Sequence, residues 1–199
     1  MPPARLKAQT QRPIDTGDEL VDAQALAPPR RVVTGKGPDG RSRIVEDGLS
    51  PAMLTVPARV GYRNANLWRT IGSPAPVEAA DSIVDQRGVL PPIGGTVLRV
   101  IDFPPTPDDP AERQRLATET MRTLYPDATH DAAHAQAGMH VTCTIDYAIV
   151  LAGTMTAILE DGETDLHAGD ILVQRATNHA WENRTDQLAR IAFVLIDGQ

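Results

Sequence analysis

Four polar residues in the C-terminal half stand next to apolar, strand-like runs. His140, Thr142 and Asp146 begin the stretch GMHVTCTIDYAIVLAG, which becomes wholly apolar at 148–152, and His179 precedes AWEN. Imidazole and carboxylate groups are costly to bury without a partner, so this placement suggests that they line an opening. Two imidazoles and one carboxylate can hold a divalent ion and leave positions for water or substrate. We therefore predict His140, Asp146 and His179 as metal ligands.

The donor set does not determine which metal is bound. Two histidines and one carboxylate are most typical of Fe(II), while Zn, Mn or Ni also accept them. Asp146 is one methylene shorter than a glutamate, so its carboxylate has a shorter reach toward an ion. A polar pocket without metal is the alternative.

Residues around these ligands provide weaker candidates. Thr142, Tyr147 and Trp181 are expected to contact a substrate, although packing within the barrel explains the aromatic residues equally well. Cys143 should be a buried, inert thiol. His130 and His134 are four residues apart, but the Ala and Asp around them indicate a solvated segment. No residue is identified as catalytic.

The elements that must position these side chains are mostly strands. After residue 138 the chain is almost continuously strand-like, with turns at short and regular intervals, which is typical of an antiparallel barrel or sandwich. Residues 31–34 and 42–46 flank GPDG and predict a hairpin. Further strands are expected in NANLWRTIG and GGTVLRVIDF. One surface helix is predicted, because Asp109 can cap its start and Pro110 suits its first turn. Its buried face would contain Leu116, Thr120 and Leu124, which recur at four-residue spacing.

This pattern predicts four regions. Residues 1–27 form a flexible arm, 28–105 contribute N-terminal strands that pack on the barrel, 106–137 form a helical connector, and 138–199 form the barrel core. Edge strands invite pairing with another copy, so we expect a homodimer.

Composition excludes several classes of partner. The chain of 199 residues has a net charge of −7 and no block of Lys and Arg, which argues against a nucleic-acid partner. A single cysteine fits a reducing compartment. No apolar stretch approaches the ~20 residues of a membrane span, and the first residues lack the apolar middle of a secretory signal. We expect a cytoplasmic protein with a small-molecule substrate and no membrane association.

The stretch from about Gly138 to Asp197 resembles the cupins. Their first motif has a histidine, any residue, a histidine, three or four residues, a glutamate, six residues and a glycine, where this chain has His140, Thr142, Asp146 and Gly153. Their second motif is matched by Gly169, Asp170, His179 and Asn183. The resemblance is greater to small bacterial and fungal cupins of the pattern MHxTxTIDYxxVLxG, GDxVVQRGTNHAW and AFVLID, over about sixty residues. It implies an all-β, antiparallel barrel (a double-stranded β-helix or jelly roll) with extra N-terminal strands and one or two short helices.

Cupins catalyse many reactions, so the resemblance does not choose one. A metal acting as a Lewis acid on a small organic acid, or on a polyketide-like or aromatic-derived substrate, predicts lyase, decarboxylase, dehydratase or isomerase chemistry. An Fe(II)-dependent dioxygenase would use the same ligands. A non-catalytic, small-molecule-binding cupin is the third possibility.

Overall fold

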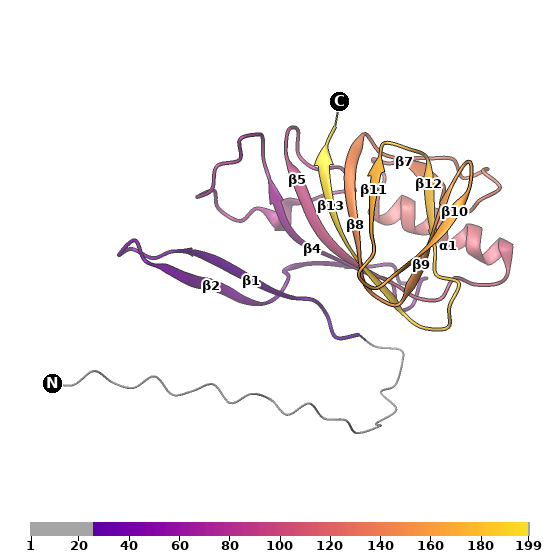
Figure 1. The fold of residues 1–199 in the computed structure, drawn as a ribbon, viewed down its shortest axis with the longest axis horizontal. Coiled ribbons are helices and arrows are strands. Elements are labelled where there is room, and N and C mark those ends of the chain that lie inside the picture. The colour runs from indigo at the N-terminus through magenta and orange to yellow at the C-terminus, as the bar shows by residue number, and fades with distance from the viewer. Residues whose placement is uncertain (1–25, 199) are drawn as a thin grey trace, which may run out of the picture.

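Two antiparallel sheets face each other in the computed structural model, which describes residues 26–198. The larger sheet has the order β11 (Ile171–Arg175), β8 (Thr144–Ala152), β13 (Ala189–Asp197), β5 (Thr96–Phe103), β4 (Arg63–Thr70) and β3 (Ala52–Thr55). The smaller sheet has the order β10 (Glu163–His167), β9 (Thr154–Leu159), β12 (His179–Glu182), β7 (His140–Val141) and β6 (Thr129–His130). The predicted all-β barrel is confirmed (Figure 1).

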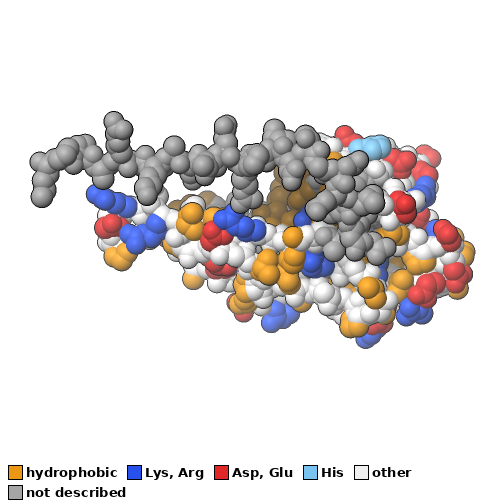
Figure 2. All heavy atoms as spheres, turned by 90° about the horizontal axis from the view of Figure 1, so that it is seen from below, with side chains coloured by type: hydrophobic (Ala, Val, Ile, Leu, Met, Phe, Trp, Pro, Cys, Tyr) orange, Lys and Arg blue, Asp and Glu red, His pale blue; other side chains and the backbone are white. Residues whose placement is uncertain are grey.

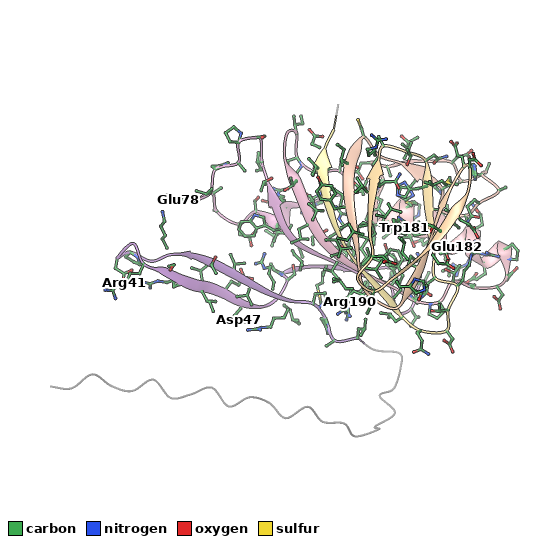
Figure 3. The ribbon with its side chains drawn as sticks, in the orientation of Figure 1. Arg41, Asp47, Glu78, Trp181, Glu182 and Arg190 are labelled. Carbon is green, nitrogen blue, oxygen red and sulfur yellow. The ribbon has the colours of Figure 1, made fainter. Side chains whose placement is uncertain are left out.

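A separate two-stranded ribbon precedes the barrel. β1 (Arg30–Lys36) pairs antiparallel with β2 (Ser42–Leu49), as the GPDG turn predicts. Figure 1 shows the ribbon extending away from the two sheets, and Figure 3 labels Arg41 near its tip. Most of the predicted arm at 1–27 lies outside the described residues.

The core lies between the sheets. Every second residue of β13 points inward, namely Ile191, Phe193 and Leu195. These side chains belong to the same buried cluster as Met155 of β9, against which Trp181 of β12 also packs. The Trp181 and Phe193 rings are edge to face with centroids 5.5 Å apart, so this aromatic pair joins the two sheets.

The predicted helix is confirmed as α1 (Pro110–Leu124). The Asp109 side chain accepts hydrogen bonds from the backbone N–H groups of Ala111 and Glu112, and Pro110 occupies the first turn. Leu116, Thr120 and Leu124 form its buried face, as their spacing predicts. Between α1 and residue 138 the chain forms turns and β6 and no second α-helix; a short 3₁₀ turn, η1 (Ile83–Asp85), lies earlier in the chain.

The larger sheet combines strands from both ends of the chain. β5 pairs with β13 along eight residues, and β4 pairs with β5. The predicted division at residue 138 therefore crosses a single hydrogen-bonded sheet, because β4 and β5 are part of the barrel wall. None of the helices in residues 26–198 is long and apolar enough to cross a membrane.

The first motif ends at a tight turn that requires glycine. Gly153 joins β8 to β9 with a φ of 72°, and a Cβ there would lie 2.9 Å from the Ala189 Cα. Any other residue would strain the turn that directs β9 into the smaller sheet.

Candidate active site

Two predicted ligands meet across neighbouring strands. His140 on β7 and His179 on β12 are direct cross-strand partners, so their side chains project from the same face of the smaller sheet. Their ring centroids are 4.3 Å apart. The two cupin-like motifs thus place one imidazole each at the same point of the barrel.

Both rings are held in the same tautomer. His140 Nδ1 lies 2.8 Å from the Gly138 carbonyl oxygen and His179 Nδ1 lies 2.9 Å from that of Thr177. A carbonyl oxygen only accepts, so each Nδ1 carries the proton and each Nε2 keeps a free lone pair. This orientation of histidine by a backbone carbonyl is frequent among metal ligands.

The pair is neutral at physiological pH. Burial, followed by the nearby His179, lowers the pKa of His140 to about 3. Burial also lowers the pKa of His179, which is only 5% exposed, against the hydrogen bond to Thr177. Both Nε2 lone pairs are therefore available to a ligand's proton or to a metal ion.

A third histidine, which the sequence assigned to a solvated segment, lies beside this pair. His130 on β6 is the cross-strand partner of His140, and its Nε2 is buried without a hydrogen-bond partner. Burial lowers its pKa as well. The sequence spacing gave no signal for this row of imidazoles, because β6 and β7 have only two residues each and follow an irregular segment.

Asp146 projects into the barrel from the opposite sheet. It is 6% exposed on β8, and its Oδ1 has no hydrogen-bond partner among the described residues. Burial raises the pKa of this carboxyl, while the Thr144 hydroxyl and the charge of Arg99 oppose the shift. The carboxyl is therefore easier to protonate than an ordinary aspartate.

One cavity of about 110 Å³ connects these groups. His140, His179, Asp146 and Trp181 all line it. A water needs about 10–15 Å³ by this measure, so the space is large enough for a small organic molecule. Much of the remaining surface is apolar and comes from β5, β13 and α1: Ile101, Phe103, Leu116, Ala117, Met121, Phe193 and Leu195. Arg59, Arg99 and Arg113 also line the cavity.

The other predicted pocket residues lie in different places. Trp181 lines the cavity, and Figure 3 labels it beside Glu182 on β12. Tyr147 is 41% exposed on the outer face of β8, because it follows the inward-facing Asp146 in a regular strand. Thr142 is buried and bonds Thr144 through their hydroxyls at 2.8 Å, outside the cavity lining. Cys143 is exposed, so the expectation of a buried thiol was wrong.

Two polar residues fix the geometry behind the site. Asn183 donates to the carbonyls of Phe103 and Gln187, and so links the end of β5 to the turn that precedes β13. Glu182 accepts from Gln136, Arg184 and Arg113, and these bonds hold its pKa below the usual value although burial opposes them.

The residues fit a divalent ion in donor type. Two free imidazole nitrogens and an orphaned carboxylate oxygen line one cavity. Within residues 26–198, however, no three His, Cys, Asp or Glu side chains are gathered closely enough to hold a metal ion. His140 and His179 are paired, Asp146 faces the same space from the other sheet, and its role as third ligand stays a prediction.

Comparisons with known proteins agree with the fold. No family model matches the chain. It is 29% identical over 189 residues to Phomopsin biosynthesis cluster protein C' of Diaporthe leptostromiformis, covering 89% of this chain and 83% of that protein. It is 26% identical over 191 residues to the cupin-domain-containing oxidoreductase fogC of Aspergillus ruber, covering 92% and 80%. Over a shorter segment of 63 residues it is 40% identical to the cupin-domain-containing oxidoreductase virC of Hypocrea virens, covering 30% and 32%.

Among solved structures, a Cupin 2 conserved barrel domain protein from Salinispora arenicola matches 72% of this chain and 82% of its own, with 12% identity and a TM-score of 0.39. That likeness is too weak to bear on function. The two facing sheets and the paired histidines of the two motifs, together with relatives that match along most of the chain, support a small cupin domain.

Proposed function

We propose that this chain is a cupin enzyme that transforms a small organic acid in the cavity between its sheets. The observation that carries this proposal is the His140 and His179 pair, whose free Nε2 atoms stand at a cavity that is otherwise largely apolar. Free bases beside an enclosed apolar space are typical of a catalytic or binding centre.

One divalent ion, Fe, Zn, Mn or Ni, completes the proposed site. His140 and His179 would bind it through Nε2, and the Asp146 carboxylate is the proposed third ligand. When bound, such an ion would polarise a carbonyl or carboxylate oxygen. The donor atoms support this proposal, and metal analysis is needed to test it.

The protonation states of the chain's own residues suit a metal site. Both imidazoles are neutral at physiological pH and keep an Nε2 lone pair for an ion, while Asp146, whose pKa is raised by burial, would lose its proton on binding one. Donors on opposite walls of one cavity would hold the ion against a bound acid, which suits its decarboxylation, dehydration or isomerisation. The apolar walls around them exclude water from the reacting group.

A second candidate is an Fe(II)-dependent dioxygenase. Relatives that are named cupin-domain-containing oxidoreductases favour it, and the same imidazole pair would bind the iron. A third candidate, a small-molecule-binding cupin without catalysis, would use the cavity alone. We further propose a cytoplasmic homodimer, with no membrane or nucleic-acid partner; Figure 2 shows acidic, basic and apolar side chains interspersed on the face in view.

Elemental analysis of protein purified without added metal, followed by aerobic and anaerobic assays on a panel of small organic acids, tests the proposal. Bound metal with turnover that needs no oxygen is the expected result. Stoichiometric iron with oxygen consumption would select the dioxygenase. Ligand binding without metal or turnover would select the binding protein.

A further inference from the structure

A buried arginine stands in the cavity without a counter-ion. Arg99 is 1% exposed on β5, where it shares the inward face with Ile101 and Phe103, and all three line the cavity. Its Nη2 donates to the Val89 carbonyl at 2.9 Å. Its Nε and Nη1 have no hydrogen-bond partner among the described residues.

This arrangement is energetically unfavourable in the absence of a ligand. A buried charge is normally paired with an opposite charge, because removing it from water costs several kcal/mol. No carboxylate in residues 26–198 forms an ion pair with Arg99. By contrast, Asp102, three residues along the same strand and on its other face, is contacted by both Arg63 and Arg190. The fold thus pairs one buried charge twice and leaves Arg99 unpaired.

The described groups around Arg99 include no paired carboxylate, and its guanidinium carbon lies 5.8 Å from the Tyr125 ring centroid. Arg59, which lines the cavity too, lies over the Tyr62 ring at 4.7 Å and has no ion pair among the described residues. The Tyr62 and Tyr125 hydroxyls bond each other at 2.8 Å. The charge of Arg99 acts on the carboxyl of Asp146, but the two side chains form no ion pair. The excess charge in this part of the cavity is positive.

We propose that Arg99 is the anchor for a carboxylate group of the cavity's ligand, and that its two free nitrogens select an anionic ligand over a neutral one of the same shape. The inference deepens the proposed function and rests on it only for the choice of cavity. Arginine binds carboxylates strongly because its hydrogen bonds to them are charge-assisted.

The position of Arg99 sets the pose of the ligand. Arg99 is the cross-strand partner of Phe193, whose ring packs on Trp181 of the facing sheet. A carboxylate on Arg99 therefore extends the body of the ligand past these rings, toward the wall that carries the two imidazoles. A monocarboxylate with a compact apolar or aromatic body fits such a lining. Arg99 is then a specificity-determining residue, which binds the part of the ligand that does not react.

The test compares the affinities of the full chain for benzoate and for its neutral isostere benzamide. Both are measured on protein from which metal has been removed. Trp68 and Trp181 are the two tryptophans of the chain, so a Trp68→Phe background makes Trp181 fluorescence report on the cavity. Benzoate should bind at least about tenfold more tightly than benzamide. Arg99→Met should abolish this preference, and Arg99→Lys should restore part of it. Arg122→Gln, which removes an exposed charge from α1, should leave it unchanged.

Equal affinities for the two probes in the parent protein would overturn the inference. So would a preference that survives in Arg99→Met, or a parent protein that binds neither probe. Unfolding of both Arg99→Met and Arg99→Gln would assign Arg99 a structural role and overturn it as well. Because binding is measured without metal or turnover, an inactive protein that still prefers benzoate would contradict the proposed function alone.

Discussion

The rings of His140 and His179 lie with their centroids 4.3 Å apart on adjacent strands, each with its Nδ1 fixed by a backbone carbonyl. This relationship leaves two unprotonated Nε2 atoms close together in a region shielded from bulk water. Burial disfavours protonation of both rings, with the nearby His179 adding to the effect at His140, and this has a consequence for stability.

The metal-free protein should lose stability as the pH falls from about 6.5 to 4. The unfolded chain binds a proton at His140 near its ordinary pKa of about 6.5, whereas the folded chain does so only near 3. The unfolded state therefore holds more protons in this window, and stability falls by up to about 1.4 kcal/mol per pH unit. Urea unfolding at several pH values, with EDTA present, measures it.

His140→Gln is the matched variant, because glutamine does not titrate. Its stability should depend less steeply on pH than that of the parent. The difference between the two proteins removes the opposite contribution of Asp146, whose raised pKa favours the folded state as the pH falls. Parallel curves would show that His140 is accessible to protons in the folded state.

Replacement of Asp146 separates a ligand from a structural carboxyl. Asp146→Asn keeps the size but removes the charge, so metal occupancy should fall while the protein stays folded. Its melting temperature should change little, since the buried Oδ1 has no partner to lose and the amide oxygen can still accept from the Thr144 hydroxyl. Asp146→Glu should retain metal, because the longer side chain brings the carboxylate nearer to the histidines. Unchanged occupancy with a loss of about 1–3 kcal/mol in Asp146→Asn would indicate a structural role.

Replacing the two buried charged residues of β5, Asp102 and Arg99, should have different effects on the stability of the fold. Asp102 accepts from Arg63 and Arg190 at the edge of the barrel, so Asp102→Ala leaves two guanidinium groups without their partner. A loss of about 3–5 kcal/mol is expected. Arg99→Met removes an unpaired charge and should leave the melting temperature unchanged or raise it. A larger loss for Arg99→Met than for Asp102→Ala would contradict this account of the strand.

Dimerisation should involve the ribbon. A two-stranded sheet is marginally stable alone, and the outer face of β1 and β2 exposes Val32, Ile44 and Leu49, with Ile44 60% and Leu49 54% exposed. We expect a dimer in light scattering coupled to size exclusion, and a shift toward monomer in the double variant Ile44→Asp with Leu49→Asp. A monomer of 21.4 kDa for the parent protein at micromolar concentration would contradict the expectation.

Much of this architecture could be predicted because the sequence signals for it are local. The hairpin rests on GPDG, α1 on Asp109 and Pro110, and the paired histidines on motifs of fixed spacing. The cavity could not be predicted in this way, since Arg99 reaches it through the pairing of β5 with β13, which are distant in sequence. The position of His130 beside the imidazole pair depends likewise on the pairing of β6 with β7. Tyr147 was misjudged for a different reason: nearness in sequence to Asp146 places it on the opposite face of the strand.

Titration of the metal-free chain with Zn²⁺, followed by calorimetry, tests the site most directly. The account predicts one ion per chain in the parent protein, and binding at least about tenfold weaker in both His140→Gln and His179→Gln, because each variant removes one of two imidazole ligands. His167→Gln, which changes an exposed histidine in the turn after β10, is the control and should bind as the parent does. Absence of zinc binding, or equal affinity in all four proteins, would contradict the assignment of this pair as a metal site.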